Sequence, residues 1–204
     1  MTLALPGIDT LPPVAMRQAA LGQWDTPPWL AARVAEELSL WDVETAHVLE
    51  PSAGLGNVVA ALLDRGVPRV TAIELDPLRV AHLRSRFDHR VTVIEADFLD
   101  AAPLLGDFDG IAGNPPYDSG ADTAHLAAIA DIICRSELGT MASLLLRTVA
   151  LHGKERWERV WSRVSARPMP VVERVAFGEE TGMIDVSVVA VRQGASGLHI
   201  RRPT

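Results

Sequence analysis

Strand-like and helix-like stretches alternate along most of this chain of 204 residues. Short apolar runs such as AHVLEP, RVTAIEL and RVTVIEADF have the composition of buried strands. The segments between them, GNVVAALLDR and PLRVAHLRSRF, repeat apolar residues at helical spacing. Strands joined through helices pair in parallel, because the helix returns the chain to the edge where the previous strand began. The alternation therefore predicts an α/β fold with a doubly wound, seven-stranded, mostly parallel sheet.

The N-terminal part departs from this alternation. TPPWLAARVAEELSLW has Thr26 as a candidate N-cap, followed by two prolines in the first turn. Leu30, Val34, Leu38 and Trp41 recur at spacings near four. We expect a helix that buries this apolar face.

The C-terminal part contains two strand-like runs with no helical stretch between them, PVVERVAFG at 170–178 and IDVSVVAVRQ at 184–193. They are expected to pair as an antiparallel hairpin at one edge of the sheet. A chain of this length favours one domain. We therefore divide it into an N-terminal arm (1–22), a single domain (23–195) and a C-terminal tail (196–204).

Composition narrows the class of protein. The formal net charge of -7 argues against a protein that coats nucleic acid without specificity. The charge is unevenly distributed: residues 1–140 hold 9 basic and 20 acidic residues, whereas residues 141–204 hold 10 basic and 6 acidic residues. No run reaches the roughly 18 apolar residues of a membrane span, and the start lacks a basic signal-peptide region, so a cytoplasmic protein is expected. One cysteine and scattered histidines show no metal-ligand spacing, so no metal is expected.

The residues after each strand are the candidate site, because ligands bind beyond the carboxyl ends of the strands in such sheets. The first strand ends in LEPSAGLGN. Gly54 and Gly56 suit a sharp turn with a close ligand, or a tight turn alone. A dinucleotide fingerprint would have glycine where Val59 stands. Glu50 would repel a pyrophosphate and attract a cation.

The next two strand ends carry acids. Glu74 in IELDP follows Gly54 by twenty residues, the spacing at which an acid binds ribose hydroxyls; the alternative is an acid favoured by the helix that begins near Pro77. In EADF, Asp97 can accept from the amine of a purine while Phe98 covers its ring, although a turn acid and a core aromatic would look the same. Together these residues describe an adenosine with a cationic group, which S-adenosylmethionine fits.

The fourth strand ends in GNPPY. Pro115 and Pro116 have no N–H groups, so the segment offers carbonyl oxygens, and Asn114 adds an amide oxygen. Hydrogen bonds from both N–H groups of a conjugated amine to such acceptors free its lone pair for attack on a methyl group. Tyr117 supplies a flat face for a planar substrate. We expect the catalytic residues here: Asn114, Pro115, Pro116 and Tyr117.

In this order, QWDTPPW, LEPSAGLGN, IELDP, ADF and GNPPY resemble the successive motifs of class I S-adenosylmethionine-dependent amino-methyltransferases acting on adenine N6. This order, with the TPPW segment first, is similar to gamma-class DNA adenine methyltransferases, and the downstream part, with its LLLR strand, basic helix and last strand, is similar to small phage-borne adenine methyltransferases. The resemblance covers residues 20–120 best and implies a Rossmann-like fold. It also implies that residues 23–27 close over the methionine end of the cofactor, with Thr26 near its carboxylate unless Thr26 is only a helix cap. The implied cofactor-binding residues are Gln23, Trp24, Thr26, Glu50, Pro51, Ser52, Gly54, Gly56, Glu74, Leu75, Asp97, Phe98 and Asn114.

The NPPY motif indicates amine chemistry more firmly than it indicates the substrate. It is shared by enzymes that methylate adenine in DNA, adenine in RNA and the glutamine side chain of release factors. We rank DNA adenine first, RNA adenine second and protein glutamine N5 third. One departure is that only 87 residues follow Tyr117, too few for the separate recognition domain of a gamma-class restriction enzyme. A non-catalytic, nucleic-acid-binding partner with this fold is a fourth alternative, and both a monomer and a homodimer remain open.

The stretch GKERWERVWSRV is a candidate nucleic-acid contact. As a helix it would place Arg156, Arg159 and Arg163 on one face, where they could lie along phosphates. In the alternative, Trp157 and Trp161 pack in the core while the arginines pair with neighbouring glutamates.

Overall fold

The computed structural model describes residues 24–117, 121–171, 175, 177 and 184–194. The expected N-terminal arm, Gln23 and the expected C-terminal tail lie outside the described residues.

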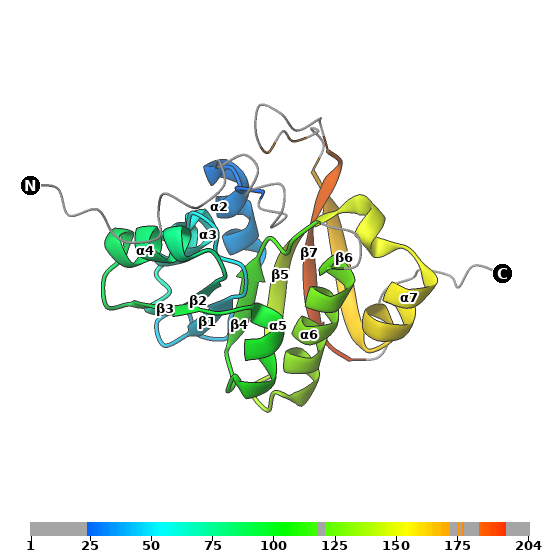
Figure 1. The fold of residues 1–204 in the computed structure, drawn as a ribbon. Helices are drawn as coiled ribbons and strands as arrows, with labels where there is room; N and C mark the ends of the chain where they lie inside the picture. The colour runs from blue at the N-terminus through cyan, green and yellow to red at the C-terminus, as the bar shows by residue number, and fades with distance from the viewer. Residues whose placement is uncertain (1–23, 118–120, 172–174, 176, 178–183, 195–204) are drawn as a thin grey trace, which may run out of the picture.

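Seven strands form a single sheet in the order β3-β2-β1-β4-β5-β7-β6 (Figure 1). All neighbours among the first five are parallel, and β7 is antiparallel to both β5 and β6. The strands are β1 (His47–Glu50), β2 (Arg69–Glu74), β3 (Val91–Glu95), β4 (Gly110–Gly113), β5 (Met141–Arg147), β6 (Val164–Pro170) and β7 (Val186–Gln193). The expected doubly wound, mostly parallel sheet is confirmed. Its strand order reverses between β1 and β4, so a ligand site is expected at their carboxyl ends.

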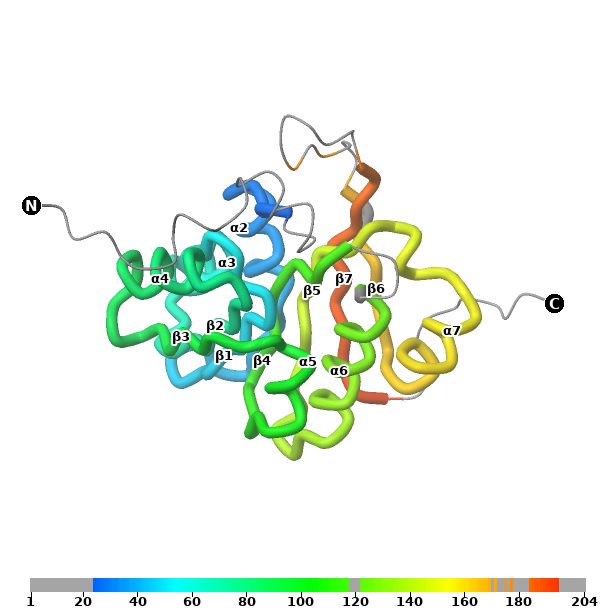
Figure 2. The backbone as a smooth tube through the Cα atoms, in the orientation of Figure 1, coloured from blue at the N-terminus to red at the C-terminus, as the bar shows by residue number. Residues whose placement is uncertain are grey.

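Helices cover both faces of the sheet, as Figure 2 shows. One face carries α2 (Pro28–Glu37), α3 (Asn57–Asp64) and α4 (Pro77–Arg86). The other carries α5 (Phe98–Ala101), η2 (Ala102–Leu104), α6 (Ala121–Arg135), η3 (Thr148–Leu151), α7 (Lys154–Arg156) and η4 (Trp157–Trp161). No helix in these ranges is long and apolar enough to cross a bilayer.

The central strands are buried on both faces, which explains their unbroken apolar sequence. In β5, Leu144 and Leu146 pack into the core cluster on the α6 side, whereas Leu145 between them packs into the cluster on the α2 side. A strand exposed on one face would alternate apolar with polar residues. Two core layers therefore fix β5 in its place in the middle of the sheet.

The C-terminal antiparallel hairpin is confirmed, but its first strand begins earlier in the chain than expected. β6 begins at Val164 rather than at residue 170. Of the predicted run 170–178, Val175 forms an isolated bridge to Ile184. β6 contains Pro168, and because β6 is the edge of the sheet, a missing ladder donor is tolerated there.

The expected helix 153–164 is also different. Only three α-helical residues, Lys154–Arg156, precede a π-helical turn, Trp157–Trp161, and the next strand begins at once.

The N-terminal helix is shorter than expected, and Trp41 is not part of its buried face. α2 ends at Glu37, and Trp41 is 83% exposed. The Arg65 guanidinium donates to the carbonyl oxygens of Ala35 and Leu38. The Ala35 carbonyl oxygen also accepts from the Leu38 N–H at 3.3 Å, and Arg65 adds side-chain donors that stabilise the end of the helix at this point. The prediction failed because the end depends on a side chain from another element.

Candidate functional site

The carboxyl end of β1 presents Glu50 at the point where the strand order reverses. The side chain is 1% exposed, and burial raises its pKa well above the ordinary value. Its Oε1 accepts a hydrogen bond from the Ser52 N–H at 3.3 Å, and its Oε2 makes none within the described part of the chain. A Cβ on Gly113 would lie 2.4 Å from Oε1, so glycine at the end of β4 makes room for this carboxyl. Pro51, next in the chain, is buried.

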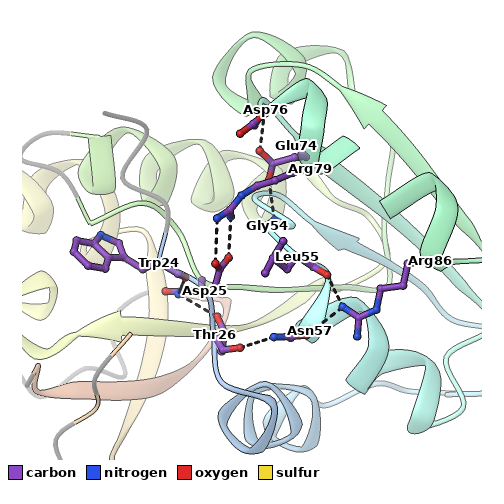
Figure 3. Close-up of polar contacts among 11 residues, drawn as sticks. Trp24, Asp25, Thr26, Gly54, Leu55, Asn57, Glu74, Asp76, Arg79 and Arg86 are labelled. Carbon is purple, nitrogen blue, oxygen red and sulfur yellow. Dashed lines mark hydrogen bonds and ion pairs between the residues drawn. The ribbon is translucent and has the colours of Figure 1, made fainter. Parts of the chain in front are cut away.

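Glu74 connects the end of β2 to the loop after β1. Its Oε2 accepts from the Gly54 N–H at 2.7 Å and its Oε1 from the Asp76 N–H at 2.8 Å (Figure 3). Burial raises its pKa. The acid that caps α4 is Asp76, whose side chain accepts from the Leu78 N–H at 2.9 Å. The side-chain cap of α4 is thus Asp76 and not Glu74, and the role of Glu74 in binding ribose stays a prediction. The next residue, Leu75, is half-exposed.

The two glycines of the loop after β1 have different surroundings. Gly56 has a φ of +83°, and a Cβ there would lie 2.6 Å from the Phe87 ring and 2.7 Å from Leu83. Helix packing alone requires this glycine. Gly54 has a φ of +55°, and a Cβ there would meet the charged ends of Arg79 and Asp25 instead. Only Gly54 faces polar groups.

Asn114, at the end of β4, holds the N-terminal segment in place. Its Nδ2 donates to the Trp24 carbonyl oxygen at 3.0 Å and to the Thr26 hydroxyl at 3.1 Å. Asn57, the first residue of α3, donates to the Thr26 carbonyl oxygen at 2.9 Å (Figure 3). The expectation of a Thr26 N-cap is wrong, because α2 begins after Pro27 without a side-chain cap. The Thr26 hydroxyl is used by Asn114.

These residues line one pocket at the switch point. Its walls are Trp24, Asp25, Thr26, Glu50, Ser52, Ala53, Gly54, Leu55, Asn57, Val58 and Asn114. Nine buried side-chain polar atoms in the described residues lack a hydrogen bond, and three belong to predicted site residues that line this pocket: Trp24 Nε1, Glu50 Oε2 and Asn114 Oδ1. Buried polar atoms are rarely left unpaired in a folded protein. Their concentration here indicates a site for a polar ligand.

Tyr117 is placed differently from the expectation of an open stacking face. Its side chain is 6% exposed and packs edge-to-face on Phe177, with ring centroids 5.7 Å apart. The Arg147 guanidinium lies 5.4 Å from the ring centroid, and Arg147 also donates to the Tyr117 carbonyl oxygen. Burial raises the pKa of the hydroxyl. Pro115 is buried and Pro116 half-buried, so a base could stack on Tyr117 only after a neighbour moved.

Asp97 and Phe98 have local structural roles, which were the alternatives to a role in binding the cofactor. Asp97 accepts from the Leu99 N–H at 2.8 Å and so caps α5. Phe98 is 3% exposed and packs against His125, with ring centroids 5.5 Å apart. Their roles in binding adenine stay predictions.

Sequence reasoning missed an ion pair at this site. Arg79 of α4 binds Asp25 through both guanidinium Nη atoms, at 2.9 and 3.1 Å. Asp25 belongs to the QWDTPPW motif but has no predicted role of its own there, and Arg79 lies outside the quoted motifs. One signal could have found Arg79: it is a cation in the first turn of a helix, where the helix dipole disfavours positive charge.

The arginines proposed to lie along phosphates are paired with carboxylates instead. Arg156 binds Asp122 at 2.6 Å, Arg159 binds Glu155 at 2.9 Å and Arg163 binds Asp131 at 2.6 Å. Of the two tryptophans, Trp161 is buried and Trp157 packs against the core. The alternative of a core-packed segment with paired arginines describes these residues better.

No protein-family model matches the chain. One curated protein of Haloarcula marismortui, named "Probable ribosomal RNA small subunit methyltransferase A", is 37% identical over 95 residues. The matching stretch covers 45% of this chain and 33% of that protein, so the chain corresponds to about a third of the relative's length.

Solved structures share the fold over more of the chain. The 23S rRNA methyltransferase ErmE has a TM-score of 0.59 at 24% identity, covering 83% of this chain and 69% of ErmE. A Streptococcus mutans protein solved in complex with S-adenosylhomocysteine (SAH) has a TM-score of 0.56 at 14% identity, covering 83% of this chain and 98% of that one. The chain therefore has the fold of class I S-adenosylmethionine-dependent methyltransferases.

Proposed function

We propose that this protein transfers a methyl group from S-adenosylmethionine to the exocyclic N6 amine of adenine in RNA, with ribosomal RNA as the substrate class. The observation that carries the proposal is the Asn114 amide. Its Nδ2 is held by the N-terminal segment, and its buried Oδ1 makes no hydrogen bond within the described residues. An acceptor of this kind, beside a pocket with an acidic wall, suits an amine substrate and a cationic cofactor.

The residues of the pocket fit S-adenosylmethionine. The buried Glu50 carboxyl has an oxygen without a partner in the described chain, and a ligand ammonium or sulfonium would satisfy it. Glu74, fixed by the Gly54 and Asp76 N–H groups, would bind the ribose hydroxyls through its remaining lone pairs. Thr26 and Trp24 would cover the methionine end. The cofactor would supply a methyl group bonded to a positively charged sulfur.

The chain itself would activate the amine and hold it. Asn114 Oδ1 accepts from one N–H of the adenine amine and the Pro115 carbonyl oxygen from the other, which localises the nitrogen lone pair for in-line attack. Pro115 and Pro116 have no N–H groups that could compete for these acceptors. Tyr117 would pack against the base once Arg147 or Phe177 shifts.

RNA is preferred to DNA because of the similar proteins. The Haloarcula marismortui relative and ErmE are both named as ribosomal RNA methyltransferases. The motif order alone had favoured DNA, with RNA as the alternative. A substrate is a property of the site and its surroundings rather than of the fold, so this preference needs a direct test.

The test measures transfer of tritiated methyl groups from S-adenosylmethionine to separate acceptors. These are unmodified ribosomal RNA, ribosomal subunits, double- and single-stranded DNA, and a release factor. We expect label in RNA, recovered as N6-methyladenosine after digestion. The Asn114→Ala variant should lower the rate at least about a hundredfold, the usual effect of removing one preorganised hydrogen-bonding group.

Other outcomes would redirect or reject the proposal. Label in DNA or in the release factor would assign a different acceptor to the same amine chemistry. Binding of SAH without transfer to any acceptor would favour the non-catalytic partner. Full activity of Asn114→Ala would remove Asn114 from the mechanism.

A further inference from the structure

The segment Trp24–Thr26 is held against the switch point from two sides. On one side Asn114 and Asn57 donate hydrogen bonds to it, at 2.9 to 3.1 Å. On the other side Asp25 forms its ion pair with Arg79, which comes from α4 on the far side of the Gly54 loop (Figure 3). Three elements distant in sequence thus meet on three consecutive residues.

The ion pair lies directly against the Gly54 corner. A Cβ on Gly54 would be 3.2 Å from Arg79 Nη1 and 3.4 Å from Asp25 Oδ1. The Arg79 side chain is 9% exposed and that of Asp25 23%. A guanidinium so far removed from water needs an anionic partner, and the N-terminal end of α4 disfavours its charge further. Arg79 is therefore compensated by Asp25, with which it forms the ion pair, and by the nearby charge of Glu74.

The pair also bears on how Asn114 is oriented. A side-chain amide can turn over and exchange its oxygen and nitrogen, and the acceptors around it decide which way it lies. For Asn114 these acceptors are the Trp24 carbonyl oxygen and the Thr26 hydroxyl, the two neighbours of Asp25. A segment that moved away from Gly54 would take both acceptors with it.

We propose that Asp25 and Arg79 are positioning residues, which close the segment Trp24–Thr26 over the Gly54 corner and thereby keep the Asn114 amide oxygen turned toward the substrate. The inference rests on the proposed function. It connects α4 to the Asn114 amide through the segment Trp24–Thr26, which would cover the cofactor. Neither residue is expected to take part in the chemistry itself.

The experiment uses Arg79→Gln, Asp25→Asn and the double variant in the full chain. NMR measures solvent exchange of the Asn114 side-chain amide protons without cofactor, and calorimetry measures SAH binding. Each single variant should speed the exchange and raise the SAH dissociation constant by about tenfold, a typical effect of breaking a partly buried ion pair. The double variant should be no worse than either single one, because both remove the same interaction.

Two further variants separate positioning from general loss of structure. Arg79→Lys keeps the charge and should restore part of the SAH affinity. Arg84→Gln removes an exposed ion pair of the same helix, with Glu95 at 3.8 Å, and should change neither measurement. Single-turnover methyl transfer at saturating cofactor should fall in Arg79→Gln and Asp25→Asn, which loss of cofactor affinity alone would not cause.

Several results would overturn the inference. Unchanged exchange of the Asn114 amide protons, or strictly additive effects in the double variant, would show that the pair does not act through the segment. Tighter SAH binding by Asp25→Asn would mean that the pair obstructs the pocket. Should the wild-type protein bind no SAH, the proposed function fails, while the exchange measurement still decides whether the pair orders Asn114.

Discussion

Glu50 lies in an environment that is unfavourable for a charged carboxyl group. Its carboxyl is buried between β1 and β4, and only the Ser52 N–H donates to it among the hydrogen bonds of the described chain. A buried carboxylate with so little compensation costs folding free energy when it is charged. The raised pKa expresses that cost. A cationic ligand would compensate the buried charge and so remove this cost. Glu50 would then lower the stability of the free protein and raise its affinity for the ligand.

We expect Glu50→Gln to stabilise the protein at pH 8, because the neutral amide avoids the free-energy cost of burying a charged carboxylate whose pKa is raised by burial. The folded state holds the Glu50 proton more tightly than the unfolded state. Below the ordinary pKa of 4.5 the carboxyl is neutral in both states, and the difference between variant and wild type should vanish. It should grow as the pH rises from there through the raised folded pKa. Urea unfolding from pH 4 to pH 8 measures it.

The same substitution should weaken SAH binding, because the glutamine amide carries no negative charge. A variant that binds SAH as tightly as the wild type would contradict the role of Glu50 as the partner of a ligand cation. Equal stability of both proteins at pH 8 would contradict the account of its burial.

At the scale of elements, the loop between β1 and α3 contains two glycines with different roles. Gly56 is needed for folding, and Gly54 is expected to be needed for ligand binding. Gly56 has a left-handed backbone because α3 begins there against α4, whose Leu83 and the following Phe87 leave no space for a Cβ. Gly54 turns the backbone so that its N–H reaches Glu74. Both glycines appear in the same sequence motif, and only the packing of α3 on α4 distinguishes them.

Alanine substitutions should separate the two requirements. Gly56→Ala should lower the free energy of unfolding by about 2 to 4 kcal/mol, through an unfavourable φ and overlap with rings and methyl groups. Gly54→Ala should cost only about 1 kcal/mol, because the Arg79 and Asp25 side chains can shift, yet it should weaken SAH binding at least about tenfold. Chemical unfolding and calorimetry compare them. Equal losses of stability would refute the distinction.

At the scale of the whole molecule, a hydrophobic core packs on each face of a single sheet. The strand order of this sheet reverses between β1 and β4, and the pocket lies at the carboxyl ends of these strands. The N-terminal segment, the loop after β1 and the end of β4 are adjacent because β1 and β4 pair at the centre of the sheet. A ligand that joins these parts stabilises the entire fold, since the parts separate when the sheet unfolds.

SAH at about a hundredfold its dissociation constant should therefore add about 2.7 kcal/mol of stability and raise the Tm by about 5 to 10 °C in a protein of this size. NAD at the same concentration should cause no shift. Its pyrophosphate would meet the Glu50 wall, and Val59 stands where a dinucleotide site has glycine. Differential scanning fluorimetry tests both ligands. A shift with NAD alone would replace the methyltransferase proposal with a dinucleotide site.

The proximity of several predicted site residues could be expected from the sequence, because the strand ends themselves position the side chains. Glu50 and Glu74 are the last residues of β1 and β2, Asn114 follows β4 directly, and the parallel sheet brings these strand ends together. Recognition was weaker for Tyr117, whose burial depends on Phe177 and Arg147 from the last third of the chain. Local sequence carries no information about such partners.

Strand and helix periodicity and proline geometry act over a few residues, so they are enough to predict the sheet class, the parallel core and the four strand ends at which chemistry could occur. The end of α2, the start of β6 at Val164, the neutralised arginines after β5 and the contact of Arg79 with Asp25 become visible only in the folded molecule. Each of these depends on a hydrogen bond, ion pair or ladder between residues far apart along the chain. Such contacts exist only once the sheet has brought their partners together.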